Sequence, residues 1–256
     1  MMLVVNAGSS SIKLVVFDAT LRPVLSGSVT EIAGDARIKI GRTDQPCLAP
    51  DHKAALGLAF AAMVAEGVPV ESLTAAAHRV VHGGATLTSA CRVTDATISQ
   101  IEACVPLAPL HNPANLMAIR ALASLAPDLP QYTSFDTAFH ATNPEVAVSY
   151  ALPVVERQRG LRRYGFHGLS YAGMVETLRA SGQLPARLLA LHLGNGASLC
   201  AIRDGLSVAT TMGYSPLDGV TMGTRTGNID GNAVLRLAEL HGIDGASRIL
   251  NRESGL

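Results

Sequence analysis

The sequence predicts an α/β protein in which mixed sheets are flanked by helices, arranged in two successive blocks. Three observations support this class. Short β-rich segments open the chain in hairpin order, later strands alternate with helices, and one hairpin pattern recurs in the second half. Because 256 residues allow one or two domains, we place a first domain over residues 1–150 and a second over residues 151–256.

Most elements follow from local residue patterns. Short runs of β-branched and apolar residues predict strands, and apolar residues at helical spacing in an alanine-rich run predict helices. A proline in a first turn is typical of a helix start. The expected strands are 3–5, 12–18, 25–32, 36–40, 75–81, 132–135, 188–193, 198–203 and 207–211, and the expected helices are 52–66, 95–104, 113–125 and 170–180.

The recurring hairpin compares LVVNAGSSSIKLVVFD at 3–18 with LALHLGNGASLCAIRD at 189–204. Each segment is a strand, a turn of small residues, a second strand and an aspartate ten residues after the turn glycine. A chance match between two hairpins is the alternative. If the repeat is genuine, two related domains each offer a small-residue turn to the cleft between them.

Composition excludes several function classes. The 20 acidic and 20 basic residues cancel, so no basic excess supports binding to nucleic acid or to an anionic membrane. No apolar stretch reaches the ~18–20 residues that span a bilayer, and the N-terminus lacks the basic region of a signal peptide. The 4 cysteines are scattered without a CxxC pair. These features predict a soluble cytoplasmic protein with reduced thiols.

The turn from Asn6 to Ser11 has the character of a phosphate clasp. Successive backbone N–H groups in a tight turn bind anions, and the serine hydroxyls and Lys13 add donors and charge. It is not a Walker loop, because GxxxxGK[ST] is absent. A plain polar turn is the alternative, which the matching turn at 192–198 makes less attractive.

The segment HRVVHGG places an arginine beside apolar residues. On a strand, Arg79 and Val81 would share one face, while His78, Val80 and His82 would share the other. An arginine next to a valine suits a small carboxylate with a short alkyl tail; a core strand with a salt-bridged arginine is the alternative. The two histidines also permit a metal hydrolase, although the valines favour a structural role.

Three further side chains stand where chemistry is common. Asp136 follows an expected strand and is a catalytic carboxylate or a helix cap. His167, between glycines before a helix, is a base, a donor to an oxyanion or a loop residue. Arg225 lies in the glycine-punctuated stretch 205–231, where it closes over an anionic transition state or stays solvated. No GxSxG elbow supports a serine hydrolase.

Taken together, VVNAGSSSIK, HRVVHGG, LAPLHNPANL, FDTAFH, YGFHG, HLGNGAS and MGTRTGNID occur in an order that resembles the acetate kinase family. The resemblance implies duplicated actin-like (RNase H-like) domains, with the second incomplete because family members continue beyond Leu256. It also implies direct in-line transfer of the γ-phosphoryl group of ATP to acetate, giving acetyl phosphate and ADP reversibly. Mg2+ and a homodimer belong to the same expectation.

Carried over position by position, the resemblance assigns roles to residues of this chain. The expected catalytic residues are Arg79, Asp136, His167 and Arg225. Arg79 would bind the acetate carboxylate, beside a methyl pocket formed by Val81, Leu110, Phe166 and Pro216. The expected nucleotide contacts are Ser9, Ser11, Lys13, His192, Leu193, Gly194, Asn195 and Gly196, with Asn6 in the metal environment.

The sequence departs from the family pattern at Ala85 and Asn228, where acids are common, and in ending before the expected adenine-binding segment. A catalytically inactive fragment is therefore one alternative. A propionate or butyrate kinase of the same family is another, although Val81 favours acetate because a longer tail would prefer a smaller side chain there.

Overall fold

The computed structural model describes residues 1–256 and divides them at the end of a strand, into Met1–Phe135 and Asp136–Leu256. The sequence-based division lies further along, at residue 150. The segment between the two boundaries includes the 3₁₀ turn η3 (Ala138–Thr142), which packs against a strand and a helix of the second unit. That packing is why the segment groups with the second unit.

The first unit is built on one mixed sheet, ordered β5-β4-β3-β2-β1-β6-β8-β7. Strand β1 pairs antiparallel with β2 and parallel with β6, and β6 pairs parallel with β8. The strands are β1 (Met2–Ala7), β2 (Ser11–Phe17), β3 (Pro23–Thr30), β4 (Arg37–Ile40), β5 (Thr43–Pro46), β6 (Ala75–Val80), β7 (Cys91–Arg92) and β8 (Gln131–Phe135).

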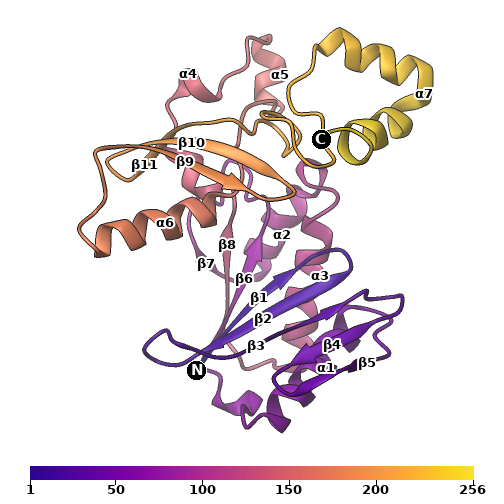
Figure 1. The fold of residues 1–256 in the computed structure, drawn as a ribbon, viewed down its shortest axis with the longest axis vertical. Helices are drawn as coiled ribbons and strands as arrows, with labels where there is room; N and C mark the ends of the chain where they lie inside the picture. The colour runs from indigo at the N-terminus through magenta and orange to yellow at the C-terminus, as the bar shows by residue number, and fades with distance from the viewer. The chain divides into compact units, whose positions relative to one another are not determined.

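Helices α1 (His52–Ala65) and α3 (Asn112–Leu125) pack against each other and against this sheet, as Figure 1 shows, and α2 (Asp95–Ala103) packs on α3. The alternating pattern of β1 buries Leu3, Val5 and Ala7 in the core with them. The opposite face of β1 is therefore left for polar residues, and it carries Asn6.

The second unit has a three-stranded antiparallel sheet and four helices. The elements are α4 (Glu145–Val148), α5 (Val154–Gln158), α6 (Gly168–Ala180), β9 (Arg187–Leu193), β10 (Ala197–Arg203), β11 (Leu206–Thr210) and α7 (Gly231–Arg252). The order β11-β10-β9 repeats the order β3-β2-β1 of the first unit, so the recurring hairpin has the same strand arrangement in both units.

The α/β class with a mixed sheet flanked by helices is confirmed, but the sequence missed several elements. Strands β5 and β7 and helices α4 and α5 are too short for a clear period, and α7 is interrupted at Gly242, where φ is 72°. Strand β6 ends at Val80, so Val81 does not continue the alternation expected of it. No helix is both long and apolar enough to cross a bilayer.

Candidate functional site

In the first unit, one face of the sheet carries a row of polar residues on three adjacent strands. Asn6 on β1 lies opposite Lys13 on β2 in the antiparallel register. On the other side, Arg79 on β6 donates from Nη1 to the amide oxygen of Asn6 at 3.0 Å. An amide between two cations is a local arrangement that attracts anions.

The turn that follows β1 is supported from below by a helix. Gly8 donates its N–H to the carbonyl of Ser11 at 2.7 Å, and its own carbonyl oxygen lies 2.8 Å from Nε2 of the buried His52, at the start of α1. Ser9 is exposed and Ser11 is half-buried. The sequence predicts His52 only as the start of a helix and gives no motif that indicates this contact.

Two buried asparagines of α3 fix the chain at the end of β6. Asn115 accepts from the N–H of Val81 at 3.1 Å and donates to the carbonyl of Ala7 at 2.8 Å, which ties β1 to β6 beyond their ladder. Asn112 accepts from the N–H of His82 and donates to its carbonyl. The NPAN sequence therefore has a structural reason: both amides satisfy backbone groups where the strand stops.

The four residues expected to form a methyl pocket are divided between the units. Val81 is buried in the first unit, whereas Leu110, just before α3, is 55% exposed. In the second unit Phe166 is buried, and the carbonyl of Pro216 accepts from Arg225. Two of the four residues thus belong to each unit.

His78 and His82 are buried core residues. Burial lowers the pKa of both to about 4, so both are neutral at pH 7, and His78 hydrogen-bonds with Gln131 at 2.8 Å. No cluster of three or more His, Cys, Asp or Glu side chains is placed to hold a metal ion. The metal-hydrolase alternative therefore has no support.

In the second unit, the YGFHG segment forms a turn in which two positions, Gly165 and Gly168, have no room for a side chain. His167 precedes α6 with φ at +60°, the left-handed region. A Cβ on Gly168 would stand 2.3 Å from the carbonyl oxygen of Asp136, and one on Gly165 would stand 2.6 Å from the ring of His140. The two glycines let the chain pass close to its neighbours and present His167.

The turn between β9 and β10 lies against His167 and Arg225. A Cβ built on Gly196 would stand 3.6 Å from Nε2 of His167 and 3.4 Å from Nη1 of Arg225. The His167 ring stacks on that of His192, with centroids 4.0 Å apart. The N–H of Gly223 points to the carbonyl of Asn195 at 3.4 Å. Leu193, at the end of β9, is 72% exposed.

Arg225 is held by its own loop. Its Nη1 donates to the carbonyl of Pro216 at 2.9 Å, and burial lowers its pKa. A guanidinium nevertheless stays charged in proteins. The structure thus places the cation beside Gly196 and partly out of water, where its field is stronger than on an open surface.

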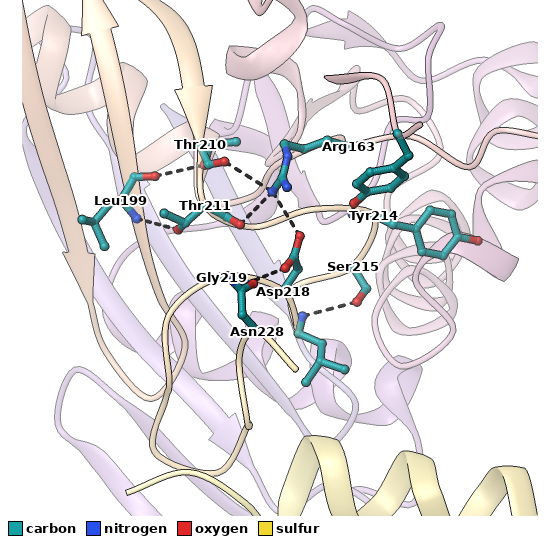
Figure 2. Close-up of polar contacts among 11 residues, drawn as sticks. Arg163, Leu199, Thr210, Thr211, Tyr214, Ser215, Asp218, Gly219 and Asn228 are labelled. Carbon is teal, nitrogen blue, oxygen red and sulfur yellow. Dashed lines mark hydrogen bonds and ion pairs between the residues drawn. The ribbon is translucent and has the colours of Figure 1, made fainter. Parts of the chain in front are cut away.

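The loop before Arg225 is anchored by an arginine that sequence reasoning missed. Arg163 donates to the carbonyl of Thr211 at 2.8 Å and pairs with Asp218 at 3.1 Å, as Figure 2 shows. It therefore ties the end of β11 to the loop, and Asp218 also accepts from the N–H of Gly219. Arg163 lies directly before YGFHG, but its spacing carries no signal of this role.

Asp136 is buried at the start of the second unit, where its backbone carbonyl accepts from the N–H of Gly168 at 2.8 Å. His140 follows in the same FDTAFH motif, and its Nε2 lies 2.9 Å from the carbonyl oxygen of Phe166. Burial lowers the pKa of His140. This histidine therefore braces the backbone just before His167, a role the sequence did not assign.

Each unit thus gathers part of the expected set. The first brings together Asn6, Lys13 and Arg79, and the second brings together His167, Gly196 and Arg225. His192 and Asn195 adjoin the second group.

Comparison with known proteins gives consistent relatives. An acetate kinase of Micrococcus luteus is 44% identical over 100% of this chain and 66% of its own length. An acetate kinase of Streptomyces coelicolor is 41% identical over 99% of this chain and 66% of its own length. A propionate kinase of Citrobacter rodentium is 40% identical over 98% of this chain and 66% of its own length. The chain therefore spans about two thirds of the length of these curated relatives.

Solved structures agree. The acetate kinase of Porphyromonas gingivalis aligns with a TM-score of 0.89 at 33% identity, over 99% of this chain and 68% of that one. The propionate kinase of Francisella tularensis aligns with a TM-score of 0.92 at 34% identity, with the same coverage. The model of the acetokinase family matches residues 1–256. The chain therefore belongs to the acetokinase family.

Proposed function

We propose that this chain carries the acetate- and phosphoryl-binding part of an acetate kinase, which transfers the γ-phosphoryl group of ATP to acetate and yields acetyl phosphate and ADP. The observation that supports this most is the approach of His167 and Arg225 to one point beside Gly196. Phosphoryl transfer needs little covalent chemistry from the protein, so donors and cations aimed at the phosphoryl oxygens supply most of the catalysis.

The geometry favours an anion in the space next to this point. Nitrogen atoms of two side chains face it from 3.4 and 3.6 Å, and glycine keeps the space open. An oxygen that lies beside this position, within about 2.9 Å of the two nitrogens, would take a charge-assisted hydrogen bond from Arg225 and a hydrogen bond from His167, each worth more than in water because the guanidinium is partly buried. In direct in-line transfer these donors would stabilise charge on the equatorial oxygens.

The polar row of the first unit supports a carboxylate-binding role for Arg79. Its guanidinium is oriented by the amide of Asn6, and Lys13 stands opposite that amide. A planar guanidinium matches the two oxygens of a carboxylate. In the proposed reaction Arg79 holds acetate, while Asp136 positions the substrate or belongs to the metal environment.

Mg2+ and ATP enter the proposal from family membership. The amide oxygen of Asn6 accepts from the guanidinium of Arg79, and a cation beside it disfavours a divalent ion at that oxygen. No three His, Cys, Asp or Glu side chains are grouped to form a metal cage. Mg2+ ordinarily keeps several waters and binds through one or two carboxylates and the substrate phosphates, so Asp136 would be the carboxylate that contributes to its environment. Asn6 is better described as orienting Arg79.

A propionate acceptor is the second candidate, because proteins named propionate kinase are about as similar to this chain as some named acetate kinase. Val81 is buried at the end of β6, and an extra methylene beside it would need a repacked neighbour. We therefore expect kcat/KM to be higher for acetate than for propionate. Equal values for the two acids would favour the second candidate.

A hydroxylamine trap tests the reaction. The chain is incubated with ATP, MgCl2, acetate and hydroxylamine, and acetohydroxamate is measured. Arg225→Ala should lower turnover by roughly 100-fold, about 3 kcal/mol, if its main contact is made in the transition state. Arg236→Ala is the matched control, since Arg236 is exposed on α7 and pairs only with Glu239 in its own helix.

An acetate-dependent signal that is lost in Arg225→Ala but kept in the control supports the proposal. Equal activity of the two variants contradicts the role of Arg225. With no signal at all, calorimetry with ATP separates a binding-competent chain from the inactive-fragment alternative.

A cytoplasmic location and a homodimer complete the proposal. The four cysteines, all free, suit a reducing compartment. Size-exclusion chromatography with light scattering tests the dimer.

A further inference from the structure

We propose that Ser198 and Tyr171 are positioning residues that hold His167 in the tautomer with its proton on Nε2. This inference rests on the proposed function, because that proton is the one His167 would donate to a phosphoryl oxygen. Neither residue belongs to the set expected from the sequence to touch substrate.

The contacts form a chain of hydroxyl groups that ends at the imidazole. The hydroxyl of Ser198, on β10, lies 2.9 Å from Nδ1 of His167. The hydroxyl of Tyr171, one turn into α6, lies 2.6 Å from the same serine oxygen and 2.8 Å from the serine carbonyl. Ser198 is fully buried and Tyr171 is 2% exposed, so water does not compete for these bonds.

The protons can be counted. Each hydroxyl has one proton, and burial raises the pKa of Tyr171, which keeps its phenol protonated. If the phenol donates to the hydroxyl oxygen of Ser198, the serine proton points to Nδ1 of His167, and the ring carries its own proton on Nε2. In the opposite arrangement the phenol donates to the serine carbonyl, the serine donates back to the phenol, and Nδ1 must carry the proton.

The sheet favours the first arrangement. The N–H of Leu199 donates to the side-chain hydroxyl of Thr211 at 3.0 Å and the carbonyl of Leu199 accepts from the N–H of Thr211 at 3.0 Å, so both groups point to the β11 side. Because backbone groups of successive strand residues point to alternate neighbours, those of Ser198 point toward β9, where the register pairs it with His192. The phenol has two acceptors within reach, the carbonyl of Ser198 at 2.8 Å and its hydroxyl at 2.6 Å. Because the carbonyl already has a partner in the ladder, we assign the phenol proton to the nearer hydroxyl.

The surroundings of Nε2 give the same answer. The side of the ring that carries Nε2 faces the point beside Gly196 that Arg225 also approaches. An anion drawn there by the guanidinium needs a donor from the imidazole, and a bare Nε2 would repel it. The ring of His192, which stacks on His167, hydrogen-bonds to a different serine: its Nδ1 lies 2.9 Å from the hydroxyl of Ser170.

The second serine provides a matched control. Ser198→Ala and Tyr171→Phe each remove one hydroxyl from the chain that ends at His167. Ser170→Ala removes the equivalent hydroxyl from the stacked ring and leaves His167 its own partner. Thermal unfolding checks that each variant is folded, and Tyr171→Phe answers the question if Ser198→Ala does not fold.

The readout is the tautomer itself. The 256-residue chain is labelled with 15N-histidine, and long-range 1H–15N correlations are recorded at pH 8, above the ordinary histidine pKa of about 6.5, with inorganic phosphate. In the wild type the Nε2–H form of His167 should dominate by about tenfold, and Ser198→Ala should bring the two forms within about threefold of each other. Tyr171→Phe should give an intermediate ratio, and Ser170→Ala should leave His167 unchanged.

An Nδ1–H form in the wild type, or an unchanged ratio in both Ser198→Ala and Tyr171→Phe, would overturn the inference. Phosphate binding, followed on the same signals, should weaken by about threefold to tenfold in Ser198→Ala. Neither readout needs turnover. A chain that forms no acetohydroxamate and binds no ATP but shows the tautomer shift therefore contradicts the proposed function and leaves this inference standing.

Discussion

Gly196→Ala should separate folding from anion binding in the second unit. The backbone of Gly196 has no positive φ, so alanine fits without strain. The added Cβ would meet Nη1 of Arg225 at 3.4 Å and Nε2 of His167 at 3.6 Å, which are ordinary contact distances. The variant should therefore fold, with a stability equal to the wild type or higher by up to about 1 kcal/mol, because alanine has less freedom in the unfolded chain.

The same methyl group removes the space for a ligand. An anion oxygen must lie about 2.7–2.9 Å from a charged nitrogen to form a strong hydrogen bond, and a carbon at the point between the two side chains displaces it. Loss of one charge-assisted bond costs about 1.5–3 kcal/mol, so phosphate should bind roughly tenfold to a hundredfold more weakly.

The assay is a titration of the His167 imidazole signals with inorganic phosphate, run beside urea unfolding of the same samples. Gly173→Ala is the control, because this glycine lies on α6 with nothing within 4 Å of an added Cβ. It should gain stability by about 0.5–1 kcal/mol and bind phosphate normally. A folded Gly196→Ala variant that binds phosphate as the wild type does would show that no anion sits between His167 and Arg225.

Three other changes test the framework of the site. Gly168→Ala would place its Cβ 2.3 Å from the carbonyl oxygen of Asp136, so we expect a loss of about 2 kcal/mol or more in urea unfolding; a normal midpoint would show that the chain can shift there. The pKa of His78 is about 4 when folded and 6.5 ordinarily, so the unfolded chain binds the extra proton between these values. The contribution of His78 to stability is therefore complete above pH 6.5 and falls by roughly 3 kcal/mol as the pH drops toward 4. His78→Gln should reduce this dependence of stability on pH, and an unchanged dependence would contradict the prediction. Arg163→Gln breaks the half-exposed ion pair with Asp218 and should lower the free energy of unfolding by about 1–2 kcal/mol, measured by thermal unfolding. Arg157→Gln is the control, because Arg157 is exposed on α5 and its loss should leave stability unchanged.

The sequence predicted the features that depend on neighbours along the chain. Short runs of apolar and β-branched residues located β1, β2 and β6, and the small-residue turns located both hairpins. The sequence placed His167 between glycines before a helix, and the positive φ of His167 and the close approach of Gly168 to Asp136 give the structural reason for those glycines. Such signals are local, because steric limits on the backbone act within a few residues.

The partners of the site residues could not be predicted in this way. Ser198 and His167 are 31 positions apart, and only the packing of α6 on the sheet of the second unit brings them together. Nothing along the chain distinguishes Arg163 from a surface arginine, because its partners Asp218 and Thr211 lie about 50 positions away. Hydroxyl and guanidinium groups form bonds in many settings, so residue type alone does not choose among them.

The two hairpins show how a repeated element acquires different chemistry. The ungapped comparison matches Ser198 with Ile12, but the strand registers do not: Asn6 lies opposite Lys13, and His192 lies opposite Ser198. The second turn is one residue shorter, so the second strand is displaced by one position, which reverses the face each side chain occupies. By register, the counterpart of Ser198 is therefore Lys13 rather than a core isoleucine.

That equivalence explains why one position carries a cation in the first unit and a buried hydroxyl in the second. Lys13 is exposed and adds charge beside Asn6. Ser198 is covered by α6, where an ammonium group would lose its water, whereas a hydroxyl is satisfied by Tyr171 and His167. In the second unit the positive charge comes instead from Arg225 on a loop. Ser198→Lys should thus prevent folding of the second unit, while Lys13→Ser should leave the first unit folded and weaken only its attraction for anions.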